Sequence, residues 1–347
     1  MLPPLISFKN STELKRALFT AGALSAPDDR LFDKLVDAGL PPLLSPTVMG
    51  LILGISPKLI TAMAAHPRRG YPYYRRFEFQ KKSGGKRVIL APRTFLKAVQ
   101  IYVLHKILET QPVPKYVTGF VKGRGIIENA TIHMGAKYLL NIDIKDFFPS
   151  VKTEDVVELF RKLGFPPAMS RTLGHLCTYQ GGLPQGAPTS PCIANLVLRD
   201  VDETILRICK ARHISYSRYA DDLTFSSERP IDGRFLTQVA GILKKHDFSL
   251  NMKKIRFAKP GQSMYVTGLV VNKKVQPNRI MRRQLRAMFH QASKNPREFR
   301  HKWANLMGWA SYVNSYDREL GQKYLAIVRD TVPRPTNRIV RPLRNTQ

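Results

Sequence analysis

The sequence has few acidic residues, few cysteines and no long apolar run. Its 347 residues include 25 Asp and Glu against 56 Lys and Arg, which gives a formal net charge of +31 and a pI near 10.3. No run of 18 apolar residues, the length that a membrane-spanning helix needs, is present. The basic residues are spread along the whole chain, so a polyanionic partner is favoured over an anionic membrane surface.

The three cysteines, Cys177, Cys192 and Cys209, form no CxxC pair and cannot all be joined in disulfides. This usage is typical of small core residues in a reducing cytoplasm. The N-terminal stretch Met1–Phe8 has no basic segment followed by an apolar core, so we do not expect a secretory signal. The length suits two or three subdomains around a substantial core.

Two adjacent carboxylates, Asp221 and Asp222, lie between segments whose hydroxyl, aromatic and β-branched residues favour strands. The pattern predicts a hairpin whose turn carries both acids. A solvated turn with no catalytic role is the alternative for this pair by itself. A third carboxylate, Asp143, follows the apolar residues of a predicted short buried strand over 138–144.

If these strands are neighbours in one sheet, the three carboxylates lie close together and repel one another at neutral pH unless a cation is bound. Two Mg²⁺ ions, roughly 3.5 to 4 Å apart, would relieve the repulsion and supply the clamp used for in-line phosphoryl transfer. Mn²⁺ is a chemically similar substitute. Asp143, Asp221 and Asp222 therefore predict a two-metal nucleotidyl transferase, as catalytic residues and as metal ligands.

Three stretches, in this order, resemble the motifs of reverse transcriptases. They are Asn-Ile-Asp-Ile-Lys-Asp-Phe-Phe-Pro-Ser at 141–150, Gly-Leu-Pro-Gln-Gly-Ala-Pro-Thr-Ser-Pro at 182–191 and Tyr-Ala-Asp-Asp at 219–222. The resemblance covers residues 71–272 by motif and the rest by length and order. It implies an α+β fold, a right-hand polymerase with fingers, a palm made of an antiparallel sheet with helices on one face, and a helical thumb.

The resemblance also divides the chain. We expect an N-terminal helical extension, fingers, a palm with a fingers insertion at about 150–185, a thumb and a basic tail, over residues 1–70, 71–137, 138–272, 273–330 and 331–347. The tail is either a disordered solvated segment or an RNA-binding arm, and both alternatives stay open.

Periodicity and breakers predict the main elements. We expect several short helices over 11–66, helices over 94–110, 153–163, 190–212, 234–247 and 279–328, and one strand with a glycine break over 264–271. Phe95 is expected on the buried face of the helix over 94–110. Trp303 and Trp309 are expected to pack in the core of the C-terminal helices rather than to stack on bases.

Residues 73–92 predict two strands joined by a Ser-Gly-Gly turn, with basic residues beside the turn. They resemble the first fingers motif, which implies that Arg87, with Lys86 near it, holds the triphosphate of the incoming nucleotide. An ordinary solvated hairpin is the alternative. Residues 117–125 resemble the second fingers motif, in which Arg124 is one of two basic residues that offer positive charge.

Three further residues are assigned by resemblance to nucleotide binding. Phe148 occupies the position where a bulky ring clashes with a ribose 2′-OH, which favours deoxynucleotides. Gln185 is implied to contact the sugar or base, with a plain turn residue as the alternative. Lys254, in preference to Lys253, is expected near the leaving pyrophosphate, where it stabilises charge or donates a proton; both lysines being surface charges is the alternative.

Two short motifs resemble hallmarks of bacterial retron reverse transcriptases. The first hallmark motif is Asn129, Ala130 and His133, and the second is Val266, Thr267 and Gly268. Without that resemblance, a histidine four residues after an asparagine on a helix is usually a packed or capping residue.

The resemblance implies a cytoplasmic bacterial enzyme that recognises its own structured non-coding RNA. Such an enzyme primes from the 2′-OH of an internal guanosine and uses dNTPs to make a branched, RNA-linked single-stranded DNA (msDNA). A separate effector protein and a role in anti-phage defence are part of the implied system. The alternatives are another bacterial reverse transcriptase, of the group II intron, diversity-generating or abortive-infection type, or a non-catalytic RNA-binding scaffold with a polymerase fold.

Overall fold

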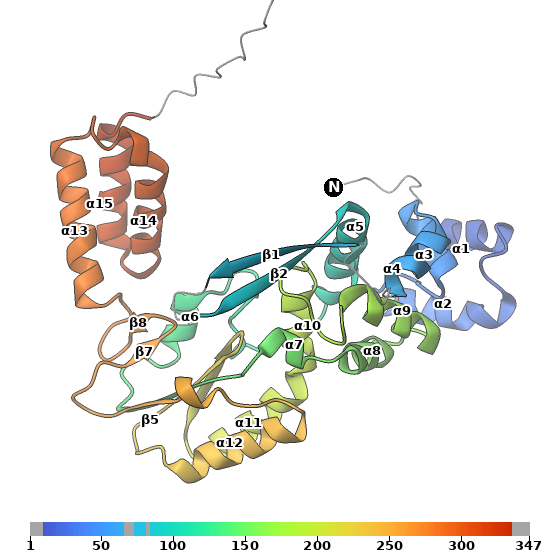
Figure 1. The fold of residues 1–347 in the computed structure, drawn as a ribbon, viewed down its shortest axis with the longest axis horizontal. Coiled ribbons are helices and arrows are strands. Elements are labelled where there is room, and N and C mark those ends of the chain that lie inside the picture. The colour runs from blue at the N-terminus through green and yellow to red at the C-terminus, as the bar shows by residue number, and fades with distance from the viewer. Residues whose placement is uncertain (1–9, 66–72, 81–83, 335–347) are drawn as a thin grey trace, which may run out of the picture.

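The computed structural model describes residues 10–65, 73–80 and 84–334. Figure 1 shows an elongated molecule with the N-terminal helices at one end, a small antiparallel sheet in the middle and a bundle of C-terminal helices at the other end. No single helix among the described residues is long and apolar enough to cross a membrane. One bent pair, Pro46–Leu53 with Pro57–Ala64 at 118°, passes that test by length and composition only.

Short helices make up the N-terminal region, as the sequence predicts. They are α1 (Ser11–Thr20), η1 (Ala26–Asp28), α2 (Asp29–Asp37), α3 (Pro46–Leu53) and α4 (Pro57–Ala64). Proline stands at the first position of α3 and α4, where its missing N–H leaves no bond unmade. Buried residues of this region, such as Leu18 and Phe32, belong to the same apolar core as the central sheet.

A two-stranded hairpin, β1 (Tyr74–Gln80) and β2 (Lys86–Pro92), stands apart from the central sheet (Figure 1). The predicted turn lies partly outside the described residues. The chain continues as α5 (Thr94–Val103), η2 (Leu104–Leu108) and α6 (Ile126–Thr131). Phe95 was expected to be buried, but it is 56% exposed because the buried stripe runs through Leu96 and Val99 instead.

The central sheet has the strand order β4-β5-β3-β6, with every neighbouring pair antiparallel. Its strands are β3 (Tyr138–Asp143), β4 (Ser215–Tyr219), β5 (Asp222–Ser227) and β6 (Arg256–Ala258). Helices α11 (Arg199–Ala211) and α12 (Gly233–Lys245) cover one face (Figure 1). Because side chains alternate along a strand, Leu223 and Phe225 enter the core beneath that face and Thr224 points to the other.

The segment between β3 and β4 is helical. It contains α7 (Phe147–Ser150), α8 (Thr153–Lys162), α9 (Pro167–Cys177) and α10 (Ser190–Val197), followed by α11. The prediction of one continuous helix over 190–212 is wrong in one respect: Leu198, at ψ 0°, separates α10 from α11. The break is local, because the amide of Asp202 still donates to the carbonyl of Leu198.

The predicted single strand over 264–271 is instead a small hairpin, β7 (Tyr265–Val266) and β8 (Leu269–Val270). Its turn residues Thr267 and Gly268 both have positive φ, at 46° and 84°, which is the pattern of a type I′ turn.

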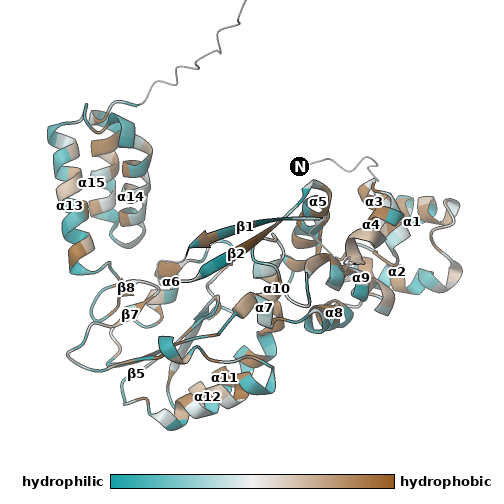
Figure 2. Cartoon of the chain, in the orientation of Figure 1, coloured by the Kyte–Doolittle hydropathy of each residue, from teal (hydrophilic) through white to brown (hydrophobic). Residues whose placement is uncertain are grey.

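Beyond this hairpin, α13 (Arg279–Lys294), η4 (Arg300–Lys302), α14 (Trp303–Tyr316), α15 (Arg318–Ala326) and η5 (Ile327–Thr331) form a bundle with a separate core. Trp303 and Trp309 pack against that core, as expected. Figure 2 shows hydrophilic residues along much of α13.

Candidate active site

Three carboxylates meet where β3 ends and β5 begins. Asp143 is the last residue of β3 and lies directly opposite Asp222, the first residue of β5. Asp221 belongs to the turn before β5, so the turn carries one of the two adjacent acids and the strand carries the other. Ligand atoms of Asp143, Asp221 and Asp222 all lie within 4.8 Å of one another. The cluster lies at the sheet face that α11 and α12 leave open.

Backbone hydrogen bonds hold the end of β3 in place beside the cluster. The amide of Ile144 donates to the carbonyl of Asp221 at 3.0 Å, and the amide of Asn251 donates to the carbonyl of Asp143 at 2.8 Å. The Asn251 side chain also reaches the carboxylate, with 3.3 Å between Nδ2 and Asp143 Oδ1. Asn251 was not singled out by the sequence analysis.

Lys254 supplies a cation to the cluster. It belongs to η3 (Met252–Lys254), and its Nζ donates to Asp143 Oδ2 at 2.6 Å. Burial opposes the charge of this ammonium, but the hydrogen bond to Asp143 and the charges of all three acids raise its pKa above the usual value. Of the two lysines that the sequence offered here, Lys254 is the one that contacts the carboxylates.

The electrostatics of the cluster suit a divalent cation. Burial, together with the charges of Asp221 and Asp143, raises the pKa of Asp222 to about 7, and burial and Asp143 likewise raise the pKa of Asp221. These carboxylates repel one another, and the single ammonium of Lys254 does not remove the repulsion. Carboxylate oxygens are the ligands that hard divalent ions prefer, so the three acids fit such an ion.

A cavity of about 720 Å³ opens beside the cluster. It runs from the acids, along β6, to the turn of the β7–β8 hairpin, and Tyr265 in its lining is 39% exposed. Its lining includes Asp143, Asp222, Lys254, Tyr265 and Thr267.

The residues assigned to nucleotide binding have the following surroundings. Phe148 is half-buried. The centroid of its ring lies 5.5 Å from the ring centroid of Phe147 and 6.0 Å from that of Phe120. The carbonyl of Gln185 accepts a hydrogen bond from the amide of Leu90 at 2.6 Å, which fixes this loop against β2.

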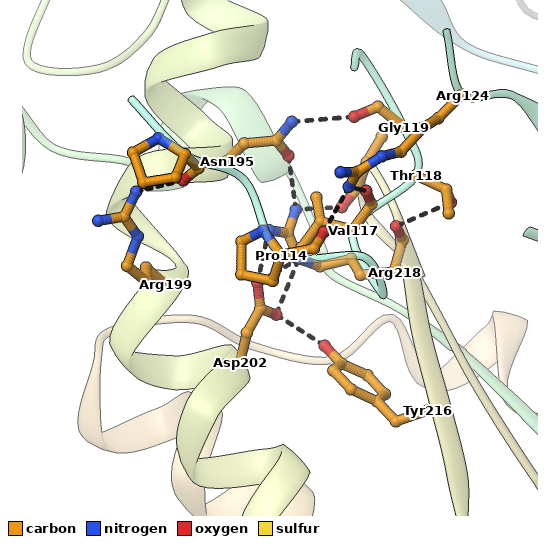
Figure 3. Close-up of polar contacts among 12 residues, drawn as sticks. Pro114, Val117, Thr118, Gly119, Arg124, Asn195, Arg199, Asp202, Tyr216 and Arg218 are labelled. Atoms are coloured by element: carbon orange, nitrogen blue, oxygen red, sulfur yellow. Dashed lines mark hydrogen bonds and ion pairs between the residues drawn. The ribbon is translucent and has the colours of Figure 1, made fainter. Parts of the chain in front are cut away.

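The basic residues at the start of β2 are both exposed. Lys86 forms an ion pair with Glu78 at 2.8 Å, and Arg87 lies next to it on the same strand. Arg124 differs from its expected role, because its guanidinium turns inward. It donates to the carbonyls of Pro114, Val117 and Val113, which places its charge on the backbone of its own loop (Figure 3).

The first hallmark motif is buried. Asn129 and His133 are 0% and 1% exposed. His133 Nδ1 lies 2.7 Å from Ser226 Oγ and its Nε2 lies 2.7 Å from Ser217 Oγ, so one imidazole bridges β4 and β5. Asn129 Oδ1 accepts from Ser217 Oγ at 2.7 Å and from the hydroxyl of Thr118. Burial lowers the pKa of His133 to about 3, so the ring is neutral at physiological pH.

The two hallmark motifs contact each other. Ala130 on α6 and Val266 on β7 belong to one small apolar core, and Thr267 Oγ1 donates to the carbonyl of Ile126 at 3.2 Å. Helix α6 therefore lies between the β4–β5 hairpin and the β7–β8 hairpin and contacts both. The packed histidine that the sequence analysis gave as the ordinary role of His133 is confirmed by its burial.

Sequence reasoning also missed Arg218, which directly precedes the Tyr-Ala-Asp-Asp motif. It is fully buried and forms an ion pair with Asp202 of α11 (Figure 3). One signal was present in the sequence: Asp202 interrupts the otherwise apolar face of α11 beside Val201 and Ile205, as a residue with a buried partner does.

Comparisons with known proteins agree with this geometry. A family model described as reverse transcriptase (RNA-dependent DNA polymerase) matches residues 79–301. Retron Mx162 reverse transcriptase of Myxococcus xanthus is 34% identical over 325 residues, which cover 83% of this chain and 67% of that protein. Retron Ec86 reverse transcriptase of Escherichia coli is 34% identical over 262 residues, covering 74% and 80%. Retron Mx65 reverse transcriptase of Myxococcus xanthus is 33% identical over 350 residues, covering 92% and 80%.

Among solved structures, apo telomerase from Candida tropicalis aligns with 76% of this chain and 57% of that chain. The TM-score is 0.47 and the identity is 10%, a likeness too distant to carry an argument. The family match and the three relatives do carry one. The chain belongs to the reverse transcriptase family of RNA-directed DNA polymerases, among the retron reverse transcriptases.

Proposed function

We propose that Asp143, Asp221 and Asp222 hold two Mg²⁺ ions and form the catalytic centre for DNA synthesis on an RNA template. The observation that carries this proposal is the meeting of the three carboxylates within 4.8 Å at the open face of the sheet. When bound, two such ions activate an attacking hydroxyl and stabilise the leaving phosphates, and Mn²⁺ supplies the same chemistry.

The chain's own cations and aromatic rings complete the proposed site. Lys254, whose ammonium already contacts Asp143, neutralises charge on the leaving pyrophosphate or donates a proton to it. Arg87 and Lys86 hold the triphosphate, and Lys86 exchanges its exposed ion pair with Glu78 for that contact. Phe148 excludes a ribose 2′-OH.

Gln185 is proposed to contact the sugar or base of the incoming nucleotide. Its loop is supported by the hydrogen bond from Leu90, so the β2 strand that carries Arg87 and the loop that carries Gln185 are fixed to each other. A nucleotide bound between them would meet the triphosphate ligands and the selecting side chains at once.

We assign the regions of the chain by the same proposal. Residues 1–70 are an N-terminal extension, 71–137 the fingers, 138–272 the palm with its insertion at about 150–185, and 273–330 the thumb. The tail at 331–347 lies mostly outside the described residues.

The thumb and the cavity beside the acids are proposed to hold nucleic acid. Helix α13 carries four arginines, one lysine and no acid, which suits a phosphate backbone. In the cavity, the exposed side chain of Tyr265 offers a flat surface on which a base at the priming end can stack. The second hallmark motif contributes Thr267 and Gly268 to the lining of the same cavity.

The specific substrate we propose is a cognate structured non-coding RNA, copied from dNTPs into an msDNA that starts at an internal 2′-OH. The relatives named above, all retron reverse transcriptases, support this proposal. A separate effector protein, acting with the enzyme against phage in the bacterial cytoplasm, belongs to the same proposal.

The test is DNA synthesis by the purified protein supplied with Mg²⁺, dNTPs and the RNA encoded beside its gene. The proposal predicts DNA that stays attached to RNA until a 2′,5′-debranching enzyme is added. Synthesis only from an annealed 3′ primer would keep the polymerase and refute the retron-type priming. Tight RNA binding with no synthesis from either primer would refute the catalytic proposal.

A further inference from the structure

Arg218 is a buried cation one residue before the Tyr-Ala-Asp-Asp motif. Its side chain is 0% exposed and that of Asp202 is 1% exposed. The guanidinium uses two nitrogens on Asp202: Nε lies 2.9 Å from Oδ1, and Nη2 lies 2.7 Å from Oδ2. The third nitrogen, Nη1, donates to Asn195 Oδ1 at 2.9 Å and to the carbonyl of Ala220 at 3.2 Å. Figure 3 shows this side chain between α11 and the loop that contains Gly119.

Stability alone does not account for an ion pair at this place. Removing two charges from water is expensive, and an apolar pair of similar volume often holds a core equally well. What an apolar pair lacks is the directed hydrogen bond from Nη1 to Ala220. A role in fixing the geometry of the turn therefore accounts for a buried charge at position 218, which a role in stability does not.

The residue that receives this bond has an unfavourable backbone conformation. Ala220 has φ +58°, in the region that favours glycine, and it is the first central residue of the two-residue turn between β4 and β5. Positive φ at the first central position, but not at Asp221, is the pattern of a type II′ turn, where glycine is the usual choice. A strained residue persists only where its surroundings hold it.

The turn is held from a second side by Gly119. A Cβ atom placed on Gly119 would lie 2.4 Å from the amide nitrogen of Ala220, so only glycine permits this approach. Asn195 joins the two supports, because it accepts from Arg218 and donates from Nδ2 to the carbonyl of Gly119 at 2.9 Å.

We propose that Arg218, oriented by Asp202, is a positioning residue that fixes the Ala220–Asp221 turn and so aims the carboxylates of Asp221 and Asp222 at Asp143. The inference rests on the proposed function only where it treats these acids as a metal site. Lysine cannot replace Arg218, because one ammonium cannot satisfy Asp202 in a fork and also reach Asn195 and Ala220.

Two variants and one control test the proposal in the full chain. Arg218→Lys keeps the charge and loses the fork. The double variant Arg218→Met with Asp202→Leu replaces the pair with apolar side chains and removes the bond to the turn. It is made in a Tyr216→Phe background, so that no buried hydroxyl is left without its Asp202 acceptor. Tyr216→Phe is the matched control, since Tyr216 donates to the same Asp202 carboxylate at 2.7 Å and has no hydrogen bond to Ala220 among the described contacts.

Two measurements distinguish positioning from stability. The first is hydrogen exchange of the amides at 219–223 in metal-free protein, and the second is Mn²⁺ binding followed by electron paramagnetic resonance. Loss of one hydrogen bond to the turn predicts about tenfold faster exchange and about tenfold weaker Mn²⁺ binding in both Arg218 variants, and less than about twofold change in Tyr216→Phe.

The double variant decides the matter. If it folds with exchange and Mn²⁺ affinity equal to those of wild type, Arg218 is a core residue only and the proposal is wrong. If wild type itself binds no Mn²⁺, the proposed metal site fails instead, while the exchange rates still decide whether Arg218 holds the turn.

Discussion

Acidification is expected to destabilise the protein through His133. This imidazole is 1% exposed, and burial lowers its pKa from 6.5 to about 3. In the unfolded chain it takes up a proton as the pH falls below 6.5, whereas in the folded protein it stays neutral until near pH 3. Its contribution is therefore complete above pH 6.5 and is lost progressively as the pH falls.

The magnitude follows from the same two pKa values. A pH of 5 is 1.5 units below the ordinary pKa of the imidazole, 6.5, so the ring is protonated in the unfolded chain. At 1.36 kcal/mol per unit, the loss of unfolding free energy relative to pH 7 is about 2 kcal/mol. That is a large part of the ~5–15 kcal/mol by which proteins of this kind are stable.

The assay is urea unfolding at pH 7 and pH 5, compared between wild type and His133→Gln. Glutamine still donates and accepts one hydrogen bond but does not titrate, and the other titrating groups are common to both proteins. Far-UV circular dichroism, with hydrogen exchange in β4 and β5, should be the probe. Tryptophan fluorescence would report on the C-terminal bundle, where both tryptophans lie.

Wild type is expected to lose about 2 kcal/mol more than His133→Gln between the two pH values. The reasoning is refuted if both proteins show the same pH dependence.

Three further predictions concern packing and chemistry. Gly321→Ala should destabilise the bundle by about 1–3 kcal/mol, because the new Cβ would lie 2.2 Å from Asn314 Cα. Gly308→Ala on α14 is the control: a Cβ there meets open space, so the change should stabilise the bundle by about 0.5–1 kcal/mol. Unfolding followed by tryptophan fluorescence measures the stability of both variants, and equal effects on the two would contradict the packing argument. Lys254→Gln should slow nucleotide incorporation by about 10²-fold at saturating dNTP, with Lys253→Gln as the control, and equal rates for the two variants would dismiss the special role of Lys254. Phe148→Ala should increase incorporation of ribonucleotides relative to deoxynucleotides, and an unchanged ratio of kcat/KM values would remove Phe148 from sugar selection.

The cluster of acids could be located from the sequence because the local pattern predicts the strands and their pairing brings the acids together. An apolar run ending at Asp143 and a hydroxyl-rich hairpin around Asp222 each predict a strand, and pairing the two strands brings the acids together. Side-chain alternation then places both acids on one face.

Other features depend on contacts between distant residues, which the local pattern does not contain. The interruption at Leu198 is invisible because leucine favours helix. The β7–β8 turn was missed because Thr267 has positive φ, a conformation that threonine rarely takes. In the sequence, Arg124 and Arg218 cannot be distinguished from surface charges. Their burial depends on partners, the carbonyls of the 113–117 loop and Asp202, that the local pattern does not identify.

The structure also changes how the first hallmark motif is understood. Asn129 and His133 are buried and bond to the hairpin that carries Asp222, so these side chains offer no surface for RNA. Their hydrogen bonds to β4 and β5 stabilise the β4–β5 hairpin.

The measurement that tests the central claim most directly is single-turnover addition of one dNTP to a 3′ primer annealed on an RNA template. Wild type should be compared with Asp222→Asn, which keeps the shape of the carboxyl group and removes its charge. Asp200→Asn, which loses an exposed acid paired with Lys162, is the control. The account predicts a loss of at least about 10³-fold in Asp222→Asn and less than about twofold change in the control. Equal rates in all three proteins would show that the carboxylate cluster is not the catalytic centre.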